Sequence, residues 1–456
     1  MNEVTVKAVA ATGQLGTGFK TESLEAAAKD ADFIACDAGS TDPGPHYLGS
    51  GQPQSSNAAV LRDLSRILKS AVEFNIPALI GSAGTSGGIP HVDLAESILR
   101  SSAKEQGLHF SMARIDTELS PSVVAEAYKR GELRPLENAP PLTEELIRSM
   151  TRIVAMAGPE PFESALTKGA QVILSGRSSD TSMYVAIPHM RGIPLGVAYH
   201  AGKTLECGAA AARTRSYPDS MAAILDMNGF TIEPPNPDFG CSPQSVAAHT
   251  LYENGDPNLL VEPCGTLDTS NSIYTAVSDR AVRVTNSKFI PADQYTVRLE
   301  AASLKGYRTV VIAGIRDPLV LMQLDDFIEG VTHLIKKKIL DSLGMAEIEY
   351  QIRWIVYGQN GTMGILEPTP ALDGHEVGVV IDVIAPTQKQ AAAIAAIAFH
   401  TALHHPIKQY TGLISSLAFP FSPPALDAGP VYEFSINHVW AIDDPMKMCK
   451  IQYSEV

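Results

Sequence analysis

The chain has 456 residues, of which 45% are hydrophobic and 19% charged, a composition typical of a globular protein with more than one domain. Its formal net charge of −15 argues against nonspecific nucleic-acid binding, which needs a basic surface. Five cysteines without a CxxC pair argue against a disulfide framework and against structural zinc. The chain shows neither a run of about 18 apolar residues nor a signal-peptide pattern, so we expect a cytoplasmic protein.

The first half repeats a pattern of apolar strand, small polar loop and amphipathic helix. Strands are expected in ADFIACDAG, IPALIGSAG, HFSMARID, GAQVILSGR and IPLGVAYHAGKT, in that order. After the first of them, AAVLRDLSRILKSAVEF places Val60, Leu64, Ile67 and Leu68 on one helical face. A second helix is expected in DLAESILRSSAKEQG. Strands that alternate with helices predict a mostly parallel sheet with helices on both faces.

The second half has a different order of elements. YTVRLEAASLKGYRTVVIAGIRD is interpreted as two adjoining strands, and a long amphipathic helix follows from Pro318. IEYQIRWIVYG and EVGVVIDVIA are two further strands, and TQKQAAAIAAIAFHTALHH is a second helix. A loop over 415–430 precedes a last strand, VYEFSINHVW. This order predicts an α/β domain over 1–258 and an α+β domain with a mostly antiparallel sheet over 259–456.

Four segments that follow predicted strands are rich in polar side chains. They cover residues 37–51, 81–88, 175–182 and 199–207. Ligands of parallel α/β sheets bind beyond the carboxyl ends of the strands, so these segments are expected to meet around one cavity. The candidate catalytic residues in them are Asp42, His46, Asp180, His200 and Glu206, and the candidate substrate-binding residues are Gly84, Thr85, Ser86, Arg177 and Lys203.

The glycine-rich stretch GSAGTSGG, residues 81–88, has three interpretations. Its backbone N–H groups could hold a phosphate or carboxylate, or it could be a plain turn. It is not a P-loop, because no Gly-Lys-Ser/Thr follows. Residues 84–88 also match GxSxG, the nucleophile elbow of α/β-hydrolases, with Ser86 as nucleophile. That elbow leads directly into a helix, and Pro90 argues against it.

The cations of these segments suggest how an acidic chain could hold an acidic substrate. The Arg177 guanidinium could bind a carboxylate through two parallel hydrogen bonds. Alternatively, Arg177 forms a local salt bridge with Asp180 at the start of the following helix. Cys207 is expected near a helix start, where its thiol pKa could be lowered, but packing as a small apolar residue is the preferred interpretation.

A fifth polar stretch follows the apolar run at residues 259–261. Residues 262–272 read EPCGTLDTSNS, and we expect them to be a loop that forms a further wall of the site. Asp268 is a candidate acid or base and Asn271 a candidate substrate ligand, while Cys264 packs behind them. No cofactor signature is evident and no metal ligands are predicted, although Asp37 and Asp42 could hold Mg²⁺ through their oxygens.

Several segments together resemble the AtuA-like family, named for acyclic terpene utilisation. They are ILSGRSSDTS, HAGKTLECGAA, LLVEPCGTLDTSNSIYTA, DQYTVRLEAASLKGYRTVVIAGIRDP and INHVWAIDDP. The family's glycine-rich N-terminal loop is similar to GQLGTGF here, residues 13–19, without the acidic residue often found after its first glycine. The resemblance implies a cytoplasmic catabolic enzyme that acts on a carboxylic acid or its thioester.

We expect a hydratase or dehydratase, a carbon–oxygen lyase acting on a hydroxylated or unsaturated di- or tricarboxylic acid or its acyl thioester. Such a reaction needs a cation that binds the substrate's carboxylate, a general base, and a general acid that protonates the leaving hydroxyl. The expected cation is Arg177, the expected base is Asp180 or His200, and the expected general acid is Asp42, His46 or Glu206.

Two alternatives belong to other classes. One is a hydrolase or thioesterase with Ser86 or Cys264 as nucleophile, and the other is a noncatalytic acyl-binding subunit. In each case the partner is a small carboxylic acid or acyl thioester, with no nucleic acid and no membrane. A homo-oligomer is expected.

Overall fold

A computed structural model of the chain describes residues 4–253, 255–369, 374–410 and 414–456. It contains two compact units, Met1–Ser303 with Phe434–Val456, and Leu304–Glu433. These units do not divide after residue 258, where we expected a domain boundary. The strands between residues 259 and 291 belong to the first unit, and the chain returns to that unit at Phe434.

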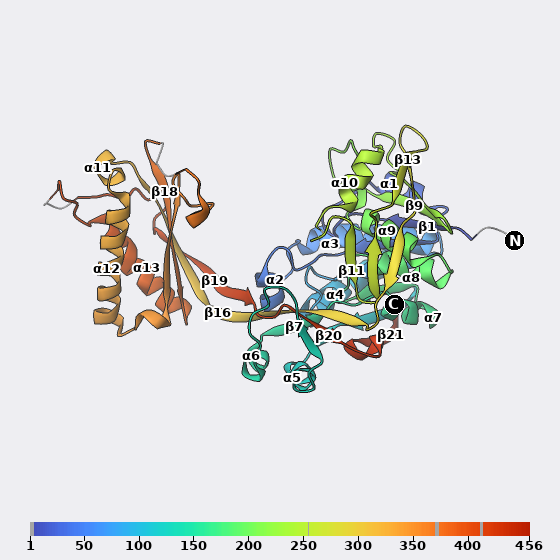
Figure 1. The fold of residues 1–456 in the computed structure, drawn as a ribbon, viewed down its shortest axis with the longest axis horizontal. Helices are drawn as coiled ribbons and strands as arrows, with labels where there is room; N and C mark the ends of the chain where they lie inside the picture. The colour runs from blue at the N-terminus through green and yellow to red at the C-terminus, as the bar shows by residue number, and fades with distance from the viewer. Residues whose placement is uncertain (1–3, 254, 370–373, 411–413) are drawn as a thin grey trace. The chain divides into compact units, whose positions relative to one another are not determined.

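The first unit is built on a ten-stranded sheet with a parallel centre (Figure 1). The parallel strands, in spatial order, are β1 (Val6–Ala10), β2 (Phe33–Asp37), β3 (Ala78–Gly81), β8 (Val172–Ser175) and β4 (Ser111–Asp116). Antiparallel strands extend both sides: β9 (Met221–Asp226), β10 (Gly229–Glu233), β14 (Val282–Thr285) and β13 (Ile273–Ala276) beyond β1, and β21 (Lys450–Glu455) beyond β4. The predicted α/β fold class is confirmed.

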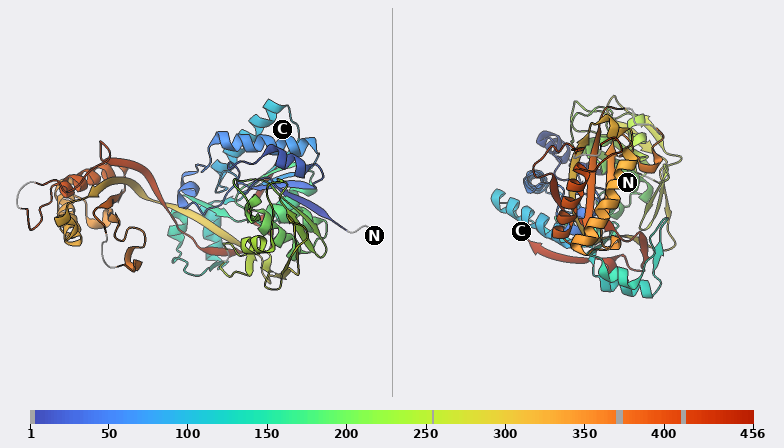
Figure 2. Two further views of the ribbon diagram at one scale, coloured as in Figure 1. Left: turned by 90° about the horizontal axis from the view of Figure 1, so that it is seen from above. Right: turned by 90° about the vertical axis from the view of Figure 1, so that its left-hand side faces the viewer.

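Alternate residues of the parallel strands pack against helices on opposite faces, because side chains in a strand alternate between its two sides. Val9 and Ile34 share one core with the helices α1 (Thr21–Ala28), α3 (Asn57–Glu73) and α4 (Ile89–Gln106). Ala8 and Phe33 share the other core with α7 (Glu160–Thr167), α8 (Ser182–Met190) and α9 (Leu195–Leu205). Figure 2 shows these blue and green helices on the two sides of the sheet.

Two further sheets are antiparallel. A three-stranded sheet holds β11 (Leu259–Glu262), β12 (Gly265–Asp268) and β15 (Lys288–Pro291). An eight-stranded sheet contains β16 (Thr296–Ile315), β17 (Gln351–Tyr357), β18 (Val377–Ala385), β19 (Ala425–Phe434), β20 (His438–Ala441), β5 (Glu118–Leu119), β6 (Leu133–Pro135) and β7 (Arg152–Ala155). Within the second unit, α12 (Leu324–Leu343) and α13 (Gln388–Leu403) share one core with β16, β17 and β18 (Figure 1). This is the antiparallel α+β layer that the sequence predicted.

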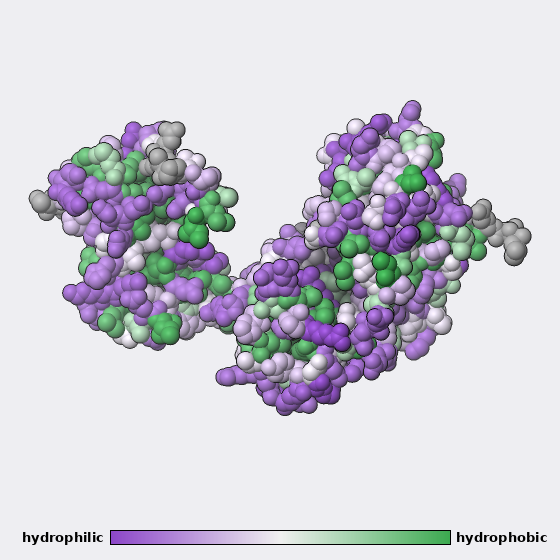
Figure 3. All heavy atoms as spheres, viewed as in Figure 1, coloured by the Kyte–Doolittle hydropathy of each residue, from purple (hydrophilic) through white to green (hydrophobic). Residues whose placement is uncertain are grey.

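Short helices complete the described chain. They are α2 (Pro45–Ser50), α5 (Pro121–Lys129), α6 (Glu144–Ser149), α10 (Pro243–Thr250), α11 (Pro318–Leu321), and the 3-10 helices η1 (Gly208–Ala211), η2 (Glu347–Glu349), η3 (Gly364–Leu366) and η4 (Pro445–Met448). No described helix has both the length and the apolar content needed to cross a membrane. Figure 3 shows a mostly polar surface with separate apolar patches on the visible face.

Four sequence predictions of elements were wrong. The segment expected as a fifth strand, IPLGVAYHAGKT, forms the helix α9, and every residue of this helix after Leu195 is buried. Periodicity cannot separate a strand from a helix that is buried on all sides. The two strands expected around residue 305 are the single strand β16, whereas the helix expected from Pro318 is interrupted between α11 and α12.

The last strand was also predicted incorrectly. The stretch VYEFSINHVW falls in two strands, β19 and β20, and β19 begins within the expected loop at Ala425. A further strand, β21, pairs with β4 near the end of the chain. Its sequence, KIQYSE, alternates polar and apolar residues as an edge strand does.

Candidate functional site

The candidate site lies in the first unit, where segments leave the carboxyl ends of β2 and β8. Two cavities of about 350 Å³ and 270 Å³ adjoin there, and they share Asp42, Asp180, Glu206 and Glu253. We call these two cavities the carboxylate cleft. Its lining also includes Asp37, Glu262 and Glu300, and the cations Arg177, Lys203 and Arg298.

Three of the four predicted strand-end segments contribute residues to this cleft, and the segment 81–88 does not. Asp42 comes from the segment after β2, Arg177 and Asp180 from the segment after β8, and Lys203 and Glu206 from the end of α9. Parallel strands end at one edge of a sheet, and this geometry brings the first three residues together. The segment that forms α9 was predicted to be a strand followed by a loop, yet Lys203 and Glu206 at the end of α9 line the cleft as expected.

The segment 81–88 supports the cleft without lining it. Thr85 Oγ1 accepts a hydrogen bond from the backbone N–H of Gln54 at 2.9 Å, and Gln54 lines the cleft. A Cβ at Gly39 would lie 2.5 Å from the Cα of Thr85, so the two loops pack backbone against backbone. Gly84, Thr85 and Ser86 are therefore placed behind the cavity wall.

Arg177 is held by protein groups on several sides. Its Nε donates to Glu300 at 2.8 Å, and its Nη1 donates to Asp180 at 3.1 Å and to Ser82 Oγ at 3.1 Å. Nη1 also donates to the carbonyl of Ser178 at 2.7 Å. The side chain is buried, and the salt bridge to Asp180 that we considered as an alternative is present. Its guanidinium therefore joins the β8 segment to β16.

Arg298 is the other arginine of the cleft, and its situation differs. It is exposed on β16 and lines the cavity two residues before Glu300. In the described part of the chain its side chain makes no ion pair or hydrogen bond. Arg298 rather than Arg177 is therefore the guanidinium that is available to a ligand.

Glu262 is a site residue that the sequence analysis did not single out. It ends β11, is 5% exposed, and accepts hydrogen bonds from Ser179 Oγ at 2.6 Å and Thr181 Oγ1 at 2.7 Å. Burial raises the pKa of Glu262 to about 7, against the lowering by the two hydroxyls, and Asp180 adds to the rise. A carboxyl with such a pKa exchanges protons near neutral pH.

Two further carboxyls of the cleft, those of Asp37 and Glu206, also have raised pKa values. Burial raises the pKa of Asp37 well above its usual range, and Asp180 raises it further. Asp37 Oδ1 has no hydrogen-bond partner among the described residues. Burial also raises the pKa of Glu206, although Lys203 forms an ion pair with it and lowers that pKa. Because several like charges in a partly buried space disfavour one another, protonation of some of these carboxyls or binding of a cation is favoured.

His200 does not reach the cleft. Its Nδ1 lies 2.7 Å from Ser287 Oγ and its Nε2 lies 3.1 Å from Thr250 Oγ1, in the core of the first unit. Burial lowers the pKa of His200 to about 3, so the imidazole is neutral. Our expectation that His200 faces the site was wrong, because α9 turns it toward β10 and β13 rather than toward the strand ends. His46 lies on α2 beside Tyr47 and is not among the residues that line the cleft.

The stretch 262–272 is a hairpin rather than one loop. Leu267 of β12 points into the core, and its neighbour Asp268 points outward, where it accepts hydrogen bonds from Ser270 Oγ at 2.6 Å and Ser270 N at 2.9 Å. Asn271 is exposed. Asp268 and Asn271 were expected in the cavity wall, but strand alternation directs Asp268 away from it, and Asn271 lies in the turn after β12. Within this stretch, Glu262 alone lines the cleft.

Backbone N–H groups within the first glycine-rich segment, and directly after the second, donate to carboxylates of the protein itself. The N–H groups of Gly16 and Gly18 donate to Asp63 at 2.8 Å and 3.0 Å. At the start of α4, the N–H of Ile89 donates to Glu118 at 2.6 Å. Pro90 lies in the first turn of α4 and does not interrupt it, contrary to our expectation. The internal carboxylates therefore occupy backbone donors that an external anion would use.

The candidate nucleophiles lack an activating base. Ser86 is buried, and its Oγ has no hydrogen-bond partner in the described chain. Nearby His91 places its Nδ1 3.1 Å from Gly88 N and its Nε2 3.1 Å from the carbonyl of Tyr47. Cys264 Sγ lies 3.1 Å from the Tyr199 hydroxyl, and burial raises the pKa of this thiol to about 11. Neither geometry favours the hydrolase alternative.

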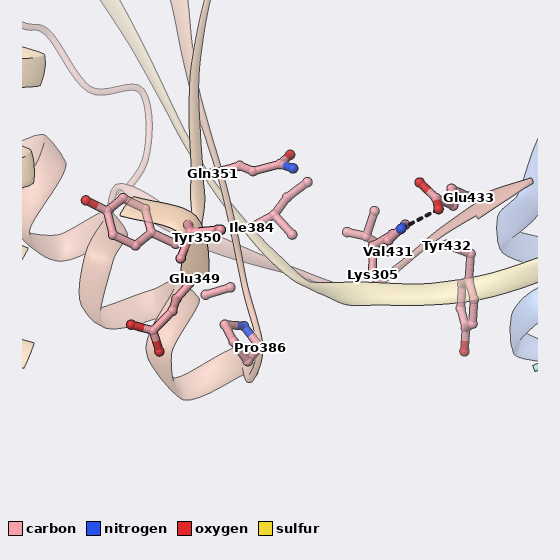
Figure 4. Close-up of a pocket in the computed structure, with 11 residues that line it drawn as sticks. Lys305, Glu349, Tyr350, Gln351, Ile384, Pro386, Val431, Tyr432 and Glu433 are labelled. Carbon is pink, nitrogen blue, oxygen red and sulfur yellow. Dashed lines mark ion pairs between the residues drawn. The ribbon is translucent and has the colours of Figure 1, made fainter. Parts of the chain in front are cut away.

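The second unit has a cavity of its own, of about 320 Å³ (Figure 4). Lys305 and Glu433 form an ion pair at one side, and Glu349, Tyr350 and Gln351 extend from the region of β17. This cavity has fewer carboxylates than the carboxylate cleft, and it lacks a histidine or cysteine in its lining. The carboxylate cleft is therefore the stronger candidate for chemistry.

Comparison with known proteins gives one match. The model of the family described as acyclic terpene utilisation family protein AtuA matches residues 57–417. No curated protein and no solved structure matches the chain. The matched region contains the cleft residues from Met156 onward, whereas those contributed before residue 57, Asp37 and Asp42 among them, lie outside it. Because the match spans well over half of the chain, the protein belongs to the AtuA family of acyclic terpene utilisation.

Proposed function

We propose that this protein is a catabolic carbon–oxygen lyase, a hydratase or dehydratase, that acts on a hydroxylated or unsaturated di- or tricarboxylic acid or its acyl thioester. Membership of a family linked to acyclic terpene catabolism supports a catabolic role. The observation that carries the proposal is Glu262, a buried carboxyl in the cleft with a pKa of about 7. A cytoplasmic location and self-association are parts of the same proposal.

The cleft offers groups for both proton transfers. In the dehydration direction, the Glu262 carboxylate would take the proton from the carbon next to the substrate's carboxylate or thioester. The electron pair of that C–H bond would form the double bond as the C–O bond breaks. Asp37, whose pKa is raised by burial, would give a proton to the leaving hydroxyl, which departs as water. Proton exchange with solvent would restore both carboxyls.

Arg298 would hold the substrate. It lines the cavity and interacts with Glu300 through charge alone, without a hydrogen bond or ion pair among the described residues, whereas Arg177 is already bound to Glu300 and Asp180. A charge-assisted hydrogen bond is worth about 1.5–3 kcal/mol. Removing it in Arg298→Gln should therefore raise KM roughly 10- to 160-fold, because that energy acts on binding. The kcat should change much less.

A mass-spectrometric assay tests the reaction class. The purified full chain would be incubated with a panel of hydroxylated and unsaturated di- and tricarboxylic acids and their CoA esters, in H₂O and in D₂O. Gain or loss of water, or deuterium exchange at the carbon next to the carboxylate, is the expected result. Release of free CoA without a change in hydration would support a thioesterase instead, and binding without any turnover would support an acyl-binding subunit.

A matched pair of variants tests the role of Glu262. Glu262→Gln keeps the side-chain shape and should lower turnover and deuterium exchange by roughly 10²–10⁴-fold. Asp268→Asn makes the same chemical change six residues away, outside the cavity, and should leave turnover unchanged. Full activity of Glu262→Gln together with an inactive Asp268→Asn would show that the wrong face of the hairpin had been assigned.

A further inference from the structure

Three metal-binding side chains meet beside the carboxylate cleft. Glu206 and Cys207 follow the last turn of α9, and His249 lies in the last turn of α10. One ligand atom from each lies within 4.8 Å of the other two. The geometry points to a binding site for a Zn²⁺ ion formed by Glu206, Cys207 and His249. The three residues do not form a recognisable sequence motif, because 42 positions separate Cys207 from His249.

His249 supplies the first independent observation. The residue is 9% exposed, and its Nε2 has no hydrogen-bond partner among the described residues. A buried polar atom without a partner costs about 1–3 kcal/mol, so such atoms call for an explanation such as an ion. The ring stacks on Tyr252, with centroids 6.1 Å apart and an angle of 22° between the planes. A metal bond would give this nitrogen the partner that it lacks.

The ligand types select the ion. A thiolate, an imidazole and a carboxylate together suit Zn²⁺ and similar transition metals, whereas Mg²⁺ and Ca²⁺ prefer oxygen ligands alone. Tetrahedral Zn²⁺ with bonds of about 2.0–2.3 Å needs ligand atoms roughly 3.3–3.7 Å apart. Small side-chain movements from the present separation of at most 4.8 Å would reach that geometry.

The fourth coordination position would be open. Cys207 and His249 both line a cavity of about 460 Å³, next to the carboxylate cleft. Three protein ligands with one open position is the arrangement of catalytic zinc sites, in which water or substrate completes the tetrahedron. A substrate oxygen could therefore reach the ion from either cavity. Zinc binding as such does not depend on the proposed lyase reaction.

The charge around the site also favours a cation. Part of the carboxylate cleft is lined by Asp37, Asp42, Asp180, Glu206 and Glu253, and by no lysine or arginine. Two cations oppose binding nearby: Lys203, which is paired with Glu206, and Arg215, which lines the cavity of His249. The Glu206–Lys203 pair uses Oε1, so Oε2 remains for the ion. On binding, Cys207 would lose its thiol proton to solvent and form the sulfur–metal bond.

Cobalt titration of the whole protein tests the site, because Co²⁺ replaces Zn²⁺ and its bond to a thiolate absorbs in the near ultraviolet. Chelator-treated protein should bind one equivalent of Co²⁺ with this absorption, and Zn²⁺ should abolish it. Cys207→Ser should lose the absorption. His249→Gln should weaken binding by more than the roughly 10–100-fold typical of outer-shell changes. Cys264→Ser, a change in another half-buried cysteine outside the cluster, should behave as the wild type.

Alkylation of the wild type gives a second measurement that needs no variant. Zn²⁺ should protect Cys207 from iodoacetamide and leave the modification rate of Cys264 unchanged, as followed by peptide mass. Absence of stoichiometric Co²⁺ binding, or a thiolate–cobalt absorption that persists in Cys207→Ser, would overturn the site. Because neither measurement uses turnover, a protein that binds Co²⁺ but does not hydrate any acid would refute the proposed reaction alone.

Discussion

Arg177→Ala removes a guanidinium that joins distant segments of the first unit. In the wild type its Nε donates to Glu300 at 2.8 Å, across 123 positions of the sequence. Its Nη1 also donates to Ser82 and Asp180. Both Arg177 and Glu300 are buried, so the variant would leave the Glu300 carboxylate with little solvent and without its ion-pair partner.

The expected loss of unfolding free energy is about 3–5 kcal/mol, the cost of removing one partner from a buried ion pair. The hydrogen bonds to Ser82 and Asp180 are included in this range. Burial alone would raise the pKa of Glu300, but Arg177 lowers it below its usual value. The contribution of Glu300 to stability is therefore present above its unfolded pKa and is lost as the pH falls through its folded pKa. The difference in unfolding free energy between the wild type and Arg177→Ala should accordingly become smaller at acid pH.

Urea unfolding followed by tryptophan fluorescence can measure this loss in the correct unit. The chain has two tryptophans, and Trp440 is buried in the first unit whereas Trp354 belongs to the second. A Trp354→Phe background leaves Trp440 as the reporter of the unit that contains Arg177. Far-ultraviolet circular dichroism on the same samples would show whether the transition has two states.

Arg298→Ala is the matched control, because it removes an exposed arginine from the same cleft. Its unfolding free energy should stay within about 0.5 kcal/mol of the wild type. A loss below about 1 kcal/mol for Arg177→Ala would refute the reasoning, since it would mean that Glu300 finds another partner or water. In that case Arg177 would again be a candidate for binding substrate.

Three further outcomes are expected. The folded pKa of Glu262, about 7, lies above its ordinary value of 4.5. Its contribution to stability is therefore full below pH 4.5 and is lost as the pH rises through 7. Over this range the unfolding free energy of Glu262→Gln should rise by up to about 3 kcal/mol relative to that of the wild type, as measured by urea titration. Asp63→Asn weakens the acceptor for Gly16 and Gly18 and should lower the unfolding free energy by about 1.5–3 kcal/mol, measured in the same way. Cys264→Ala should leave turnover in the hydration assay unchanged, because its raised pKa keeps the thiol protonated; an inactive variant would point to thiol catalysis.

The parallel sheet and part of the candidate site could be predicted from the sequence for one reason. Alternating apolar strands and amphipathic helices permit few arrangements, and parallel strands with crossover helices end at a common edge. That rule was enough to group Asp42 with Arg177 and Asp180. It could not supply Glu300, because no local pattern indicates which residue of a distant antiparallel strand faces Arg177.

The error at α9 has a different physical cause. LGVAYHAGKTL has apolar residues on all sides of the helix, since it is enclosed by the sheet and by neighbouring helices. Its polar residues His200, Lys203 and Thr204 are buried as well, so the usual contrast between an exposed polar face and a buried apolar face is missing. His200 was assigned to the site because this segment was expected to be a strand that ends in a loop. As a helical residue it points into the core, three positions before Lys203, which reaches the cleft.

β11 explains why Glu262 was passed over in favour of Asp268. In LLVE the apolar residues would be expected inside and the acid outside, yet Val261 is 77% exposed and Glu262 is 5% exposed. Hydrophobic burial would favour the opposite face, so the folded arrangement is stabilised by other contacts, among them the two hydroxyls that bind Glu262. Local rules of this kind are most often broken where a protein acts on other molecules. The inversion, which neither hydropathy nor spacing could reveal, is therefore the structural reason for placing the chemistry at Glu262.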